Sequence, residues 1–243
     1  MKVLQLNIWC GKLGKKIIDL VNTEDPEIVC FQEAMEFPGG RSFLFEDINT
    51  IIKKTGYKHY YFTPHLGYSL MKRKARMGLL ILSKFPIIET ESIYVKSEYK
   101  ENFDLLDSDH NTQSLQRATV KCDSGLIHVL NYHGYHDHNS KNGCDETIRQ
   151  CGFIANYVNN LSGKILLCGD FNLNPDSDSI KIIESVMCNH VTLNNFNNTR
   201  TNLTEKSGVS DYIFSKGNFE NTSFKVLDEI ASDHCALTFE FKE

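Results

Sequence analysis

Apolar positions along the chain recur at two-residue spacing in some segments and at 3.6-residue spacing in others, which predicts a protein that mixes strands and helices. The N-terminal part predicts a strand over Val3–Trp9, a helix around Leu13–Val21 and a short buried strand over Ile28–Phe31. Pro26 ends the helical region, because proline cannot continue a helical hydrogen-bond ladder. The chain is therefore expected to open as strand, helix, strand.

The next part of the chain predicts one helix and several strands. A helix is expected from Ser42 to Lys54 and is followed by an extended segment over Tyr57–Phe62. The apolar run Gly78–Ser83 is typical of a strand covered on both faces. The segment Ile87–Val95 follows directly after Pro86, and we expect these two strands to pair with each other.

The second half of the sequence contains a hairpin signal and the clearest helix. Strands are predicted over Gln116–Lys121 and Leu126–Tyr132, on either side of a turn at Asp123-Ser124-Gly125. The helix is predicted over Asp145–Leu161, with Ile148, Cys151, Ala155 and Val158 on its buried face.

The C-terminal part alternates strands with polar loops. A strand is predicted over Lys164–Cys168 and a helix over Ile180–Met187, and further strands over Tyr212–Phe214, Phe224–Leu227 and Ala236–Phe241. We find no internal repeat and no linker long enough to divide the chain. We therefore expect a single α/β domain over residues 1–243.

Composition and charge exclude several classes of protein. The 243 residues are 41% hydrophobic, and 26 Lys and Arg against 31 Asp and Glu give a net charge of −5, so the chain is an ordinary globular protein and not a polycation. No apolar run reaches the length of a membrane span, and the N-terminus lacks a signal-peptide pattern. Eight cysteines without a Cys-x-x-Cys pair favour a reducing compartment. We expect a cytoplasmic monomer without stable membrane insertion.

Polar residues that interrupt the ends of apolar strands are the main chemical signal. Asn7, Glu33, Asp170, Asp211 and Asp233 each stand at such an end. A carboxylate in this position loses hydration unless it is paired, hydrogen-bonded or bound to a cation. One such residue is usually a turn residue or a helix cap. Five in one chain favour a site for a cation that prefers oxygen ligands.

The motifs that carry these residues occur in a recognisable order. They read Leu-Asn-Ile-Trp at Asn7, Cys-Phe-Gln-Glu at Glu33, Leu-Cys-Gly-Asp-Phe-Asn at Asp170 and Asn172, Ser-Asp-Tyr-Ile-Phe at Asp211, and Ser-Asp-His at Asp233 and His234. Together with Gly-Leu-Leu-Ile-Leu-Ser-Lys-Phe-Pro-Ile from Gly78, this set resembles the endonuclease/exonuclease/phosphatase family from end to end. The resemblance implies a four-layered α/β sandwich, in which two packed mixed β-sheets are flanked by helices, and metal-assisted hydrolysis of a phosphate ester.

The resemblance also implies roles for individual residues. Glu33 would be the principal ligand of Mg²⁺, with Mn²⁺ as the alternative ion, and Asn7 and Asp233 would assist it; Mg²⁺ prefers oxygen ligands and takes one or two carboxylates from a protein. Asp170 would orient or deprotonate the attacking water. Asn172 would donate to the phosphoryl oxygens.

Three further positions complete the expected site. By the same resemblance, Asp211 fixes the tautomer of His234, whose imidazole supports the phosphate or transfers a proton. His133, at the end of its strand, is the second catalytic histidine, with His136 and His138 as competitors. A transition-metal site built from these three histidines is a weaker alternative. Arg117 is a candidate for the substrate phosphate, although a surface arginine on a strand is nearly as common.

The substrate class is less determined than the chemistry. Abasic-site endonucleases carry a carboxylate where this chain has Trp9, and inositol polyphosphate 5-phosphatases carry Cys-Asp-Arg where it has Ser210-Asp211-Tyr212. Two long loops, Thr63–Met77 and Lys96–Ser114, are predicted to cover the site. The first carries Lys72, Arg73, Lys74 and Arg76 beside Tyr68, which favours a nucleic-acid phosphodiester as substrate. A lipid or small-molecule phosphoester is the alternative, and a non-catalytic binding scaffold is the remote one.

Overall fold

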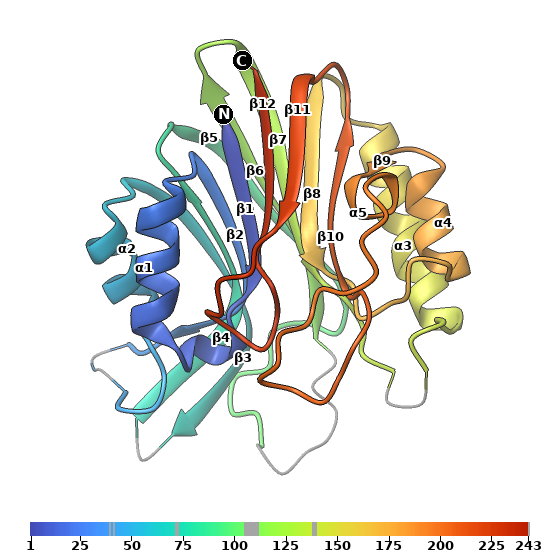
Figure 1. Cartoon of the computed structure of the whole chain (residues 1–243). Coiled ribbons are helices and arrows are strands. Elements are labelled where there is room, and N and C mark those ends of the chain that lie inside the picture. The colour runs from blue at the N-terminus through green and yellow to red at the C-terminus, as the bar shows by residue number, and fades with distance from the viewer. Residues whose placement is uncertain (39, 41, 71–72, 105–111, 138–139, 243) are drawn as a thin grey trace.

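Two six-stranded β-sheets pack against each other, and helices cover their outer faces (Figure 1). This computed structural model describes residues 1–38, 40, 42–70, 73–104, 112–137 and 140–242. The first sheet has the order β11 (Glu220–Val226), β12 (Leu237–Lys242), β1 (Lys2–Asn7), β2 (Ile28–Glu36), β4 (Arg73–Ser83) and β3 (His59–Leu70). The second has the order β5 (Ile87–Lys96), β6 (Gln113–Cys122), β7 (Gly125–His133), β8 (Lys164–Asp170), β10 (Asp211–Lys216) and β9 (Cys188–Asn189).

Helices lie outside both sheets and make the outer layers of the sandwich (Figure 1). The first sheet is flanked by α1 (Gly14–Glu24) and α2 (Ile48–Thr55), and the second by α3 (Asp145–Asn159), α4 (Asp178–Glu184) and the short α5 (His190–Leu193). A single 3-10 turn, η1 (Trp9–Gly11), follows β1. The predicted four-layered α/β sandwich with two mixed sheets is confirmed.

The direction of the strands brings the polar strand ends together. Strand β1 runs parallel to β2, and β7 runs parallel to β8, so these four strands end at the same edge of the sandwich. Strand β10 is antiparallel to β8 and begins at Asp211, directly opposite Asp170. Strand β12 is antiparallel to β1 and begins just after His234. Residues from six strands therefore meet at one edge.

Two predictions about the strands were wrong. The apolar strand over Gly78–Ser83 does not pair with β5; it belongs to β4, which pairs with β2 and β3 in the first sheet, whereas β5 pairs with β6 in the second. The segment Thr63–Met77 is not a loop, because most of it extends β3 and β4 into a long antiparallel pair. Polar residues on an edge strand leave a periodicity too weak to separate it from a loop.

The helices also differ in part from their predicted bounds. Helix α2 begins at Ile48 and not near Ser42, because the Asp47 carboxylate caps it by accepting from the backbone N–H of Asn49 at 2.7 Å. Helix α3 matches its prediction closely, but Ile148, expected on its buried face, is 43% exposed. None of the helices within the described residues has the length and apolar composition needed to cross a membrane.

The largest hydrophobic cluster joins the two sheets and packs the second sheet against α3 and α4. A second cluster packs α1 and α2 against β1, β2 and β4, with Leu6, Ile17 and Phe31 fully buried. Burial of about 25 cal/mol per Å² of apolar surface makes these clusters the main source of stability.

A chain of buried amides also crosses between the sheets. Gln5 Nε2 donates to Gln32 Oε1 at 2.9 Å, Gln32 Nε2 donates to Asn131 Oδ1 at 2.7 Å, and Asn131 Nδ2 donates to Gln116 Oε1 at 3.1 Å. All four side chains are fully buried. Gln5 Nε2 also donates to Asp211 Oδ1 at 3.2 Å, so the chain links the centre of the sandwich to the polar edge.

Candidate active site

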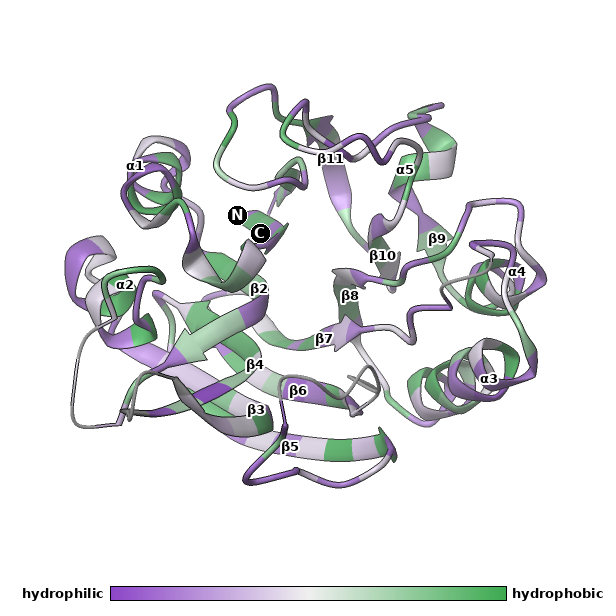
Figure 2. Cartoon of the chain, turned by 90° about the horizontal axis from the view of Figure 1, so that it is seen from below, coloured by the Kyte–Doolittle hydropathy of each residue, from purple (hydrophilic) through white to green (hydrophobic). Residues whose placement is uncertain are grey.

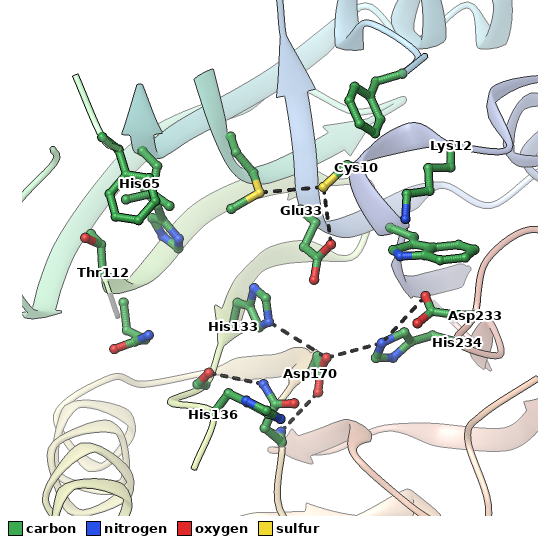
Figure 3. Close-up of a pocket in the computed structure, with 18 of the residues that line it drawn as sticks. Cys10, Lys12, Glu33, His65, Thr112, His133, His136, Asp170, Asp233 and His234 are labelled. Atoms are coloured by element: carbon green, nitrogen blue, oxygen red, sulfur yellow. Dashed lines mark hydrogen bonds and ion pairs between the residues drawn. The ribbon is translucent and has the colours of Figure 1, made fainter. Parts of the chain in front are cut away.

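The polar strand ends line a cleft with a volume of about 540 Å³. Figure 2, which views the molecule from below, shows the strand ends between the two groups of helices. Figure 3 shows the side chains that point into this cleft. Its polar lining includes Glu33, His133, Asp170, Asn172, Arg200, Asp233 and His234. The cleft therefore contains residues from both sheets and from loops far apart in the sequence.

An irregularity in β2 presents Glu33 to the cleft. The register of β2 against β4 shifts between Phe31 and Ala34, and Glu33 has a φ of 55°. A bulge with a residue in the left-handed region changes the direction in which a side chain points. Such a backbone is unfavourable for glutamate and is tolerated where the surrounding structure imposes it, commonly at functional sites. The regular part of β2 thus holds Glu33 in a conformation that a regular strand would not allow.

Asn7 connects the two carboxylates at the centre of the cleft. Its Nδ2 donates to Glu33 Oε1 at 3.0 Å and to Asp170 Oδ2 at 3.1 Å, and its Oδ1 accepts from the Trp9 backbone N–H at 3.1 Å. Asn7 is only 1% exposed. The amide therefore keeps Glu33 and Asp170 close together despite their like charge.

Asp170 is the most central carboxylate. Its Oδ1 accepts from the Asn172 backbone N–H at 3.0 Å, and its Oδ2 lies 3.6 Å from His234 Nε2 and 3.8 Å from His133 Nε2. Burial disfavours its charged form, but the positive charges of His234, Arg200 and His133 outweigh burial and hold the pKa of Asp170 below its usual value. Asp170 is therefore an ionised acceptor at neutral pH.

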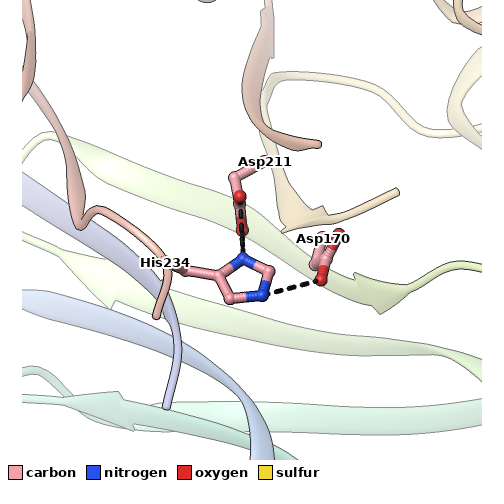
Figure 4. Close-up of side chains that lie close together, drawn as sticks. All are labelled: Asp170, Asp211 and His234. Atoms are coloured by element: carbon pink, nitrogen blue, oxygen red, sulfur yellow. Dashed lines mark hydrogen bonds and ion pairs between the residues drawn. The ribbon is translucent and has the colours of Figure 1, made fainter. Parts of the chain in front are cut away.

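Asp211 and His234 form a buried pair (Figure 4). His234 Nδ1 lies 2.9 Å from both carboxylate oxygens of Asp211, while its Nε2 faces Asp170. Burial opposes a charge on His234, but Asp211 and Asp170 raise the pKa of the imidazole above its ordinary value. Nδ1 must carry a proton to bond to a carboxylate, so Asp211 determines the tautomer.

Hydrogen bonds from other residues occupy both oxygens of Asp211. Thr199 Oγ1 and Ser210 Oγ donate to Oδ2 at 2.7 and 2.8 Å, and Gln5 Nε2 donates to Oδ1 at 3.2 Å. Among the described residues, Asp170, Asp211 and His234 are the one group of three whose ligand atoms lie within 4.8 Å of one another. Because the hydrogen bonds of Asp211 are already satisfied, these three residues are better described as a hydrogen-bonded Asp211–His234 dyad beside a second carboxylate.

Glu33 fits the chemistry of a divalent cation better. Its carboxylate accepts from Asn7 Nδ2 and from Cys10 Sγ at 3.5 Å, and no lysine or arginine within the described part of the chain is paired with it. Asp233 lies on the other side of the cleft (Figure 3), with Oδ1 accepting from Ser232 Oγ at 3.2 Å. Carboxylate and amide oxygens of this kind are the ligands that Mg²⁺ prefers. Glu33, Asn7 and Asp233 therefore fit the cation that the sequence predicts.

His133 and Asn172 also lie where a substrate phosphate would be approached. His133 ends β7 and lines the cleft, with its Nε2 toward Asp170. Asn172, with a φ of 55°, donates from Nδ2 to the Gly134 carbonyl at 3.3 Å. His136 lines the same cleft, whereas its competitor His138 lies outside the described residues. Within those residues, His133 and His136 belong to no group of three potential metal ligands.

Arg117 lies away from the cleft. Its Nη2 lies 2.8 Å from Glu89 Oε1, and its Nε lies 3.2 Å from Glu91 Oε2. The Arg117 side chain is only 10% exposed, and Arg117 is not among the residues that line the cleft. These two ion pairs account for Arg117 without a substrate, and we do not place it in the site.

Two basic residues of the segment Thr63–Met77, which was expected to cover the site, form ion pairs with glutamates. Arg76 pairs with Glu36, and Lys74 lies 3.8 Å from Glu101, and neither lines the cleft. Lys72 lies outside the described residues. Of the second predicted loop, Phe103 and Thr112 line the cleft, and residues 105–111 lie outside the described part.

Several residues that line the cleft were not predicted from the sequence. Lys12 lies with its Nζ 3.6 Å from the centre of the Trp9 ring, and both residues line the cleft. Arg200, buried beside His234, and Lys206 also belong to the lining. The only signal for Trp9 and Lys12 was their closeness to Asn7 in the sequence. Arg200 follows no strand and no motif, so nothing in the sequence singled it out.

Comparison with known proteins places this chain in a known family. The sequence pattern of the Endonuclease/Exonuclease/phosphatase family matches residues 4–234, so the chain belongs to this family. It is accordingly a phosphoester hydrolase, and enzymes of this family generally use divalent metal ions. No curated protein matches the sequence.

Solved structures share the fold at low sequence identity. An endonuclease/exonuclease/phosphatase from Beutenbergia cavernae has a TM-score of 0.75 at 14% identity, and the match covers 100% of this chain and 71% of that one. A mannosyl-6-phosphatase from Bacteroides thetaiotaomicron has a TM-score of 0.69 at 16% identity, with 100% of both chains covered. The catalytic domain of human Nocturnin has a TM-score of 0.68 at 17% identity, with 100% of this chain and 93% of that one covered.

Proposed function

We propose that this protein is a Mg²⁺-dependent phosphodiesterase that hydrolyses nucleic acid by attack of water on a phosphodiester. The observation that carries the proposal is the convergence of Glu33, Asp170 and the Asp211–His234 pair on one cleft. Carboxylates and an oriented imidazole are the groups needed to hold a cation, orient water and support a phosphoryl group.

Asp170 has the geometry of the residue that orients water. Its Oδ2 faces the cleft between His133 and His234, and Asn7 holds this oxygen in place. A carboxylate with a lowered pKa stays ionised and accepts a hydrogen bond from water, while its low basicity limits how far it removes the proton. We assign to it mainly orientation, which is a large catalytic effect when the reacting atoms are held in place.

His234 and His133 approach the same space from opposite sheets. Asp211 holds the His234 imidazole with Nε2 toward the cleft, where it supports a phosphoryl oxygen. His133 is positioned to protonate the leaving oxygen, and Asn172 to donate to a phosphoryl oxygen. Mg²⁺, or Mn²⁺ in its place, would be held by Glu33 with Asn7 and Asp233. The chemistry it supplies when bound is neutralisation of charge on the phosphoryl oxygens.

The wall of the cleft beside Glu33 supports nucleic acid as the substrate. Trp9 offers an aromatic face and Lys12 a cation next to it, a combination that suits a stacked base and its phosphate. A lipid or small-molecule phosphoester is the second candidate. It is favoured by the apolar side chains that also line the cleft, Phe45, Leu66, Met77 and Phe103.

A substrate panel tests the proposal. Purified protein with Mg²⁺ or Mn²⁺ is assayed on bis-p-nitrophenyl phosphate, single- and double-stranded DNA, RNA, sphingomyelin and inositol phosphates. We expect hydrolysis of a nucleic acid, and its loss in EDTA and in Asp170→Asn. Hydrolysis of sphingomyelin alone would establish the second candidate, and full activity in EDTA or in Asp170→Asn would contradict the mechanism.

A further inference from the structure

Arg200 is held rigidly next to the catalytic imidazole. Its backbone forms an isolated antiparallel bridge with His234, and the Thr201 N–H donates to the Asp233 carbonyl at 3.0 Å. Asn198 binds the backbone of Arg200 from the other side, accepting from its N–H at 3.2 Å and donating to its carbonyl at 2.8 Å. The segment therefore fixes where the guanidinium can lie.

The guanidinium of Arg200 is buried but poorly partnered. The side chain is 4% exposed and lines the cleft. Its Nη1 donates to His234 Nε2 and lies 3.7 Å from Asp233 Oδ2, and its buried Nε has no hydrogen-bond partner among the described residues. A guanidinium has five donors in a planar fork that matches the oxygens of a carboxylate or phosphate. Buried donors without a partner are rare and call for an acceptor.

Lys141, near Arg200, is a second cation with a buried nitrogen. Its Nζ is buried and has no hydrogen-bond partner in the part of the chain that the structure describes. Burial disfavours the ammonium, and the nearby positive charge of Arg200 also lowers the pKa of Lys141, although Asp170 and Asp211 oppose this effect. Lys206, which lines the cleft together with Arg200, is close enough to lower the pKa of Lys141 further. Arg200, Lys141 and Lys206 thus gather positive charge near His234.

We propose that Arg200, supported by Lys141, forms a phosphate-binding subsite that receives the nonbridging oxygens of the substrate phosphoryl group and of the product phosphate. An oxygen placed beside Nε and Nη1 would satisfy the unpartnered donor and would take the place of His234 Nε2 as the acceptor of Nη1. The inference rests on the proposed function, because it assumes that a phosphoryl group enters this cleft.

Inorganic phosphate is the probe that tests the subsite directly. Its dissociation constant is measured by isothermal titration calorimetry in the presence of Mg²⁺ for the wild type, Arg200→Met and Arg200→Lys. Lys15→Met is the matched control, since it also removes one positive charge but from a side chain that is 87% exposed on α1. Loss of a charge-assisted bidentate contact is expected to weaken phosphate binding by about 10- to 100-fold in Arg200→Met.

The variants separate a phosphate ligand from a merely structural residue. We expect Arg200→Lys to recover part of the affinity, Lys15→Met to bind as the wild type does, and Lys141→Met to show a smaller loss than Arg200→Met. Equal phosphate affinity in the wild type and in folded Arg200→Met would overturn the subsite, as would a wild type that does not bind phosphate. If Arg200→Met does not fold, Arg200→Lys is compared with the wild type instead, and equal phosphate affinity in these two proteins would overturn the subsite.

Failure of the subsite can be distinguished from failure of the proposed function. Asp170→Asn is expected to lose hydrolysis while it still binds phosphate. If no substrate is hydrolysed but phosphate binding depends on Arg200, the subsite stands and the phosphodiesterase proposal fails. If Asp170→Asn abolishes hydrolysis while Arg200→Met binds phosphate normally, the proposed function stands and the subsite fails.

Discussion

The Asp211 carboxylate lies 2.9 Å from Nδ1 of His234, and three further donors hold that carboxylate in place. The imidazole thus has one tautomer and one orientation, with Nε2 toward the cleft. Buried pairs of this kind orient a catalytic histidine in several unrelated hydrolases. A change at Asp211 should therefore act through the orientation of His234.

Asp211→Asn is expected to lower kcat by about 10²- to 10⁴-fold, because an amide donor at this position favours the wrong tautomer of His234. KM should change little, since Asp211 does not line the cleft. The measurement is steady-state kinetics on the substrate that the panel identifies. Ser92→Ala, on β5, is a control, and an unchanged kcat in Asp211→Asn would remove the dyad from the mechanism.

Binding of Mg²⁺ is expected to depend on Glu33. Titration calorimetry and the rise in melting temperature on adding Mg²⁺ both report metal binding without an activity assay. Glu33→Gln should weaken binding by at least about ten-fold, because it removes the carboxylate that has no cationic partner among the described residues. Glu89→Gln, which faces Arg117 away from the cleft, should bind as the wild type does. Equal Mg²⁺ binding by the wild type, Glu33→Gln and Glu89→Gln would show that Glu33 does not bind the metal ion.

The buried amide chain between the sheets is expected to contribute to stability as a unit. Asn131→Leu removes the acceptor of Gln32 Nε2 and the donor to Gln116 Oε1, and leaves both groups buried without a partner. Each unsatisfied group costs about 1–3 kcal/mol. Urea unfolding should therefore show a loss of roughly 2–5 kcal/mol. A loss below about 1 kcal/mol would mean that water or a rearranged partner replaces the amide.

Alanine substitutions at two glycines are expected to change the stability of the protein in opposite directions. A Cβ on Gly78 of β4 would lie 2.0 Å from the Thr63 carbonyl oxygen, so Gly78→Ala must push the two paired strands apart. We expect it to destabilise the protein by roughly 2–4 kcal/mol. Gly152 lies inside α3 with no atom within 4 Å of its added Cβ, and Gly152→Ala should stabilise by about 0.5–1 kcal/mol. Thermal melts measure the melting temperature of each variant relative to the wild type. If both melting temperatures rise or both fall, the packing of β4 is contradicted.

Stability is expected to fall as the pH decreases below about 6.5, because buried histidines are neutral in the folded protein. Burial lowers the pKa of His190 from 6.5 to about 4 and, together with the charge of His133, that of His65 to about 3. The unfolded chain therefore takes up protons near pH 6.5 that the folded protein does not accept. Each histidine should remove about 2 kcal/mol of unfolding free energy between pH 7 and pH 5.

The variant His190→Gln isolates this effect. It should be less stable than the wild type at pH 7, since the His190 ring packs against Phe239 and bonds to Ser215. Its loss of stability between pH 7 and pH 5 should nevertheless be about 2 kcal/mol smaller. Chemical denaturation at the two pH values measures both quantities. An equal loss in variant and wild type would show that His190 titrates alike in the folded and unfolded states.

Local patterns predicted the elements that are strongly periodic and buried. The hairpin of β6 and β7, helix α3 and strand β8 lie close to where apolar spacing and turn residues indicated. Polar or lightly packed segments were predicted poorly. The long pair of β3 and β4 was taken for a loop over Thr63–Met77, and Ile148 was placed on the wrong face of α3, because which face is covered depends on what packs there.

The chemistry of the site was readable in the sequence because its residues interrupt apolar strands. Asn7, Glu33, Asp170 and Asp233 could be chosen in this way, since polar side chains at the ends of buried strands need a partner, whereas the role of His234 came from the resemblance of its motif to a known family. Their meeting in one cleft depends on strand order and direction, which no single segment encodes. The parallel pairs β1–β2 and β7–β8 place four strand ends at one edge, and the antiparallel β10 and β12 add Asp211 and His234.

The sequence by itself determined the class of fold, the polar residues at the strand ends and the chemistry that they can support. Only the tertiary structure decided which charges are already paired. Arg117, a candidate for the phosphate, is paired with two glutamates away from the cleft, whereas Arg200, which no motif indicated, is buried beside His234 with an unpartnered Nε. The physical reason is that the partner of a charge is set by contacts between segments far apart in the chain.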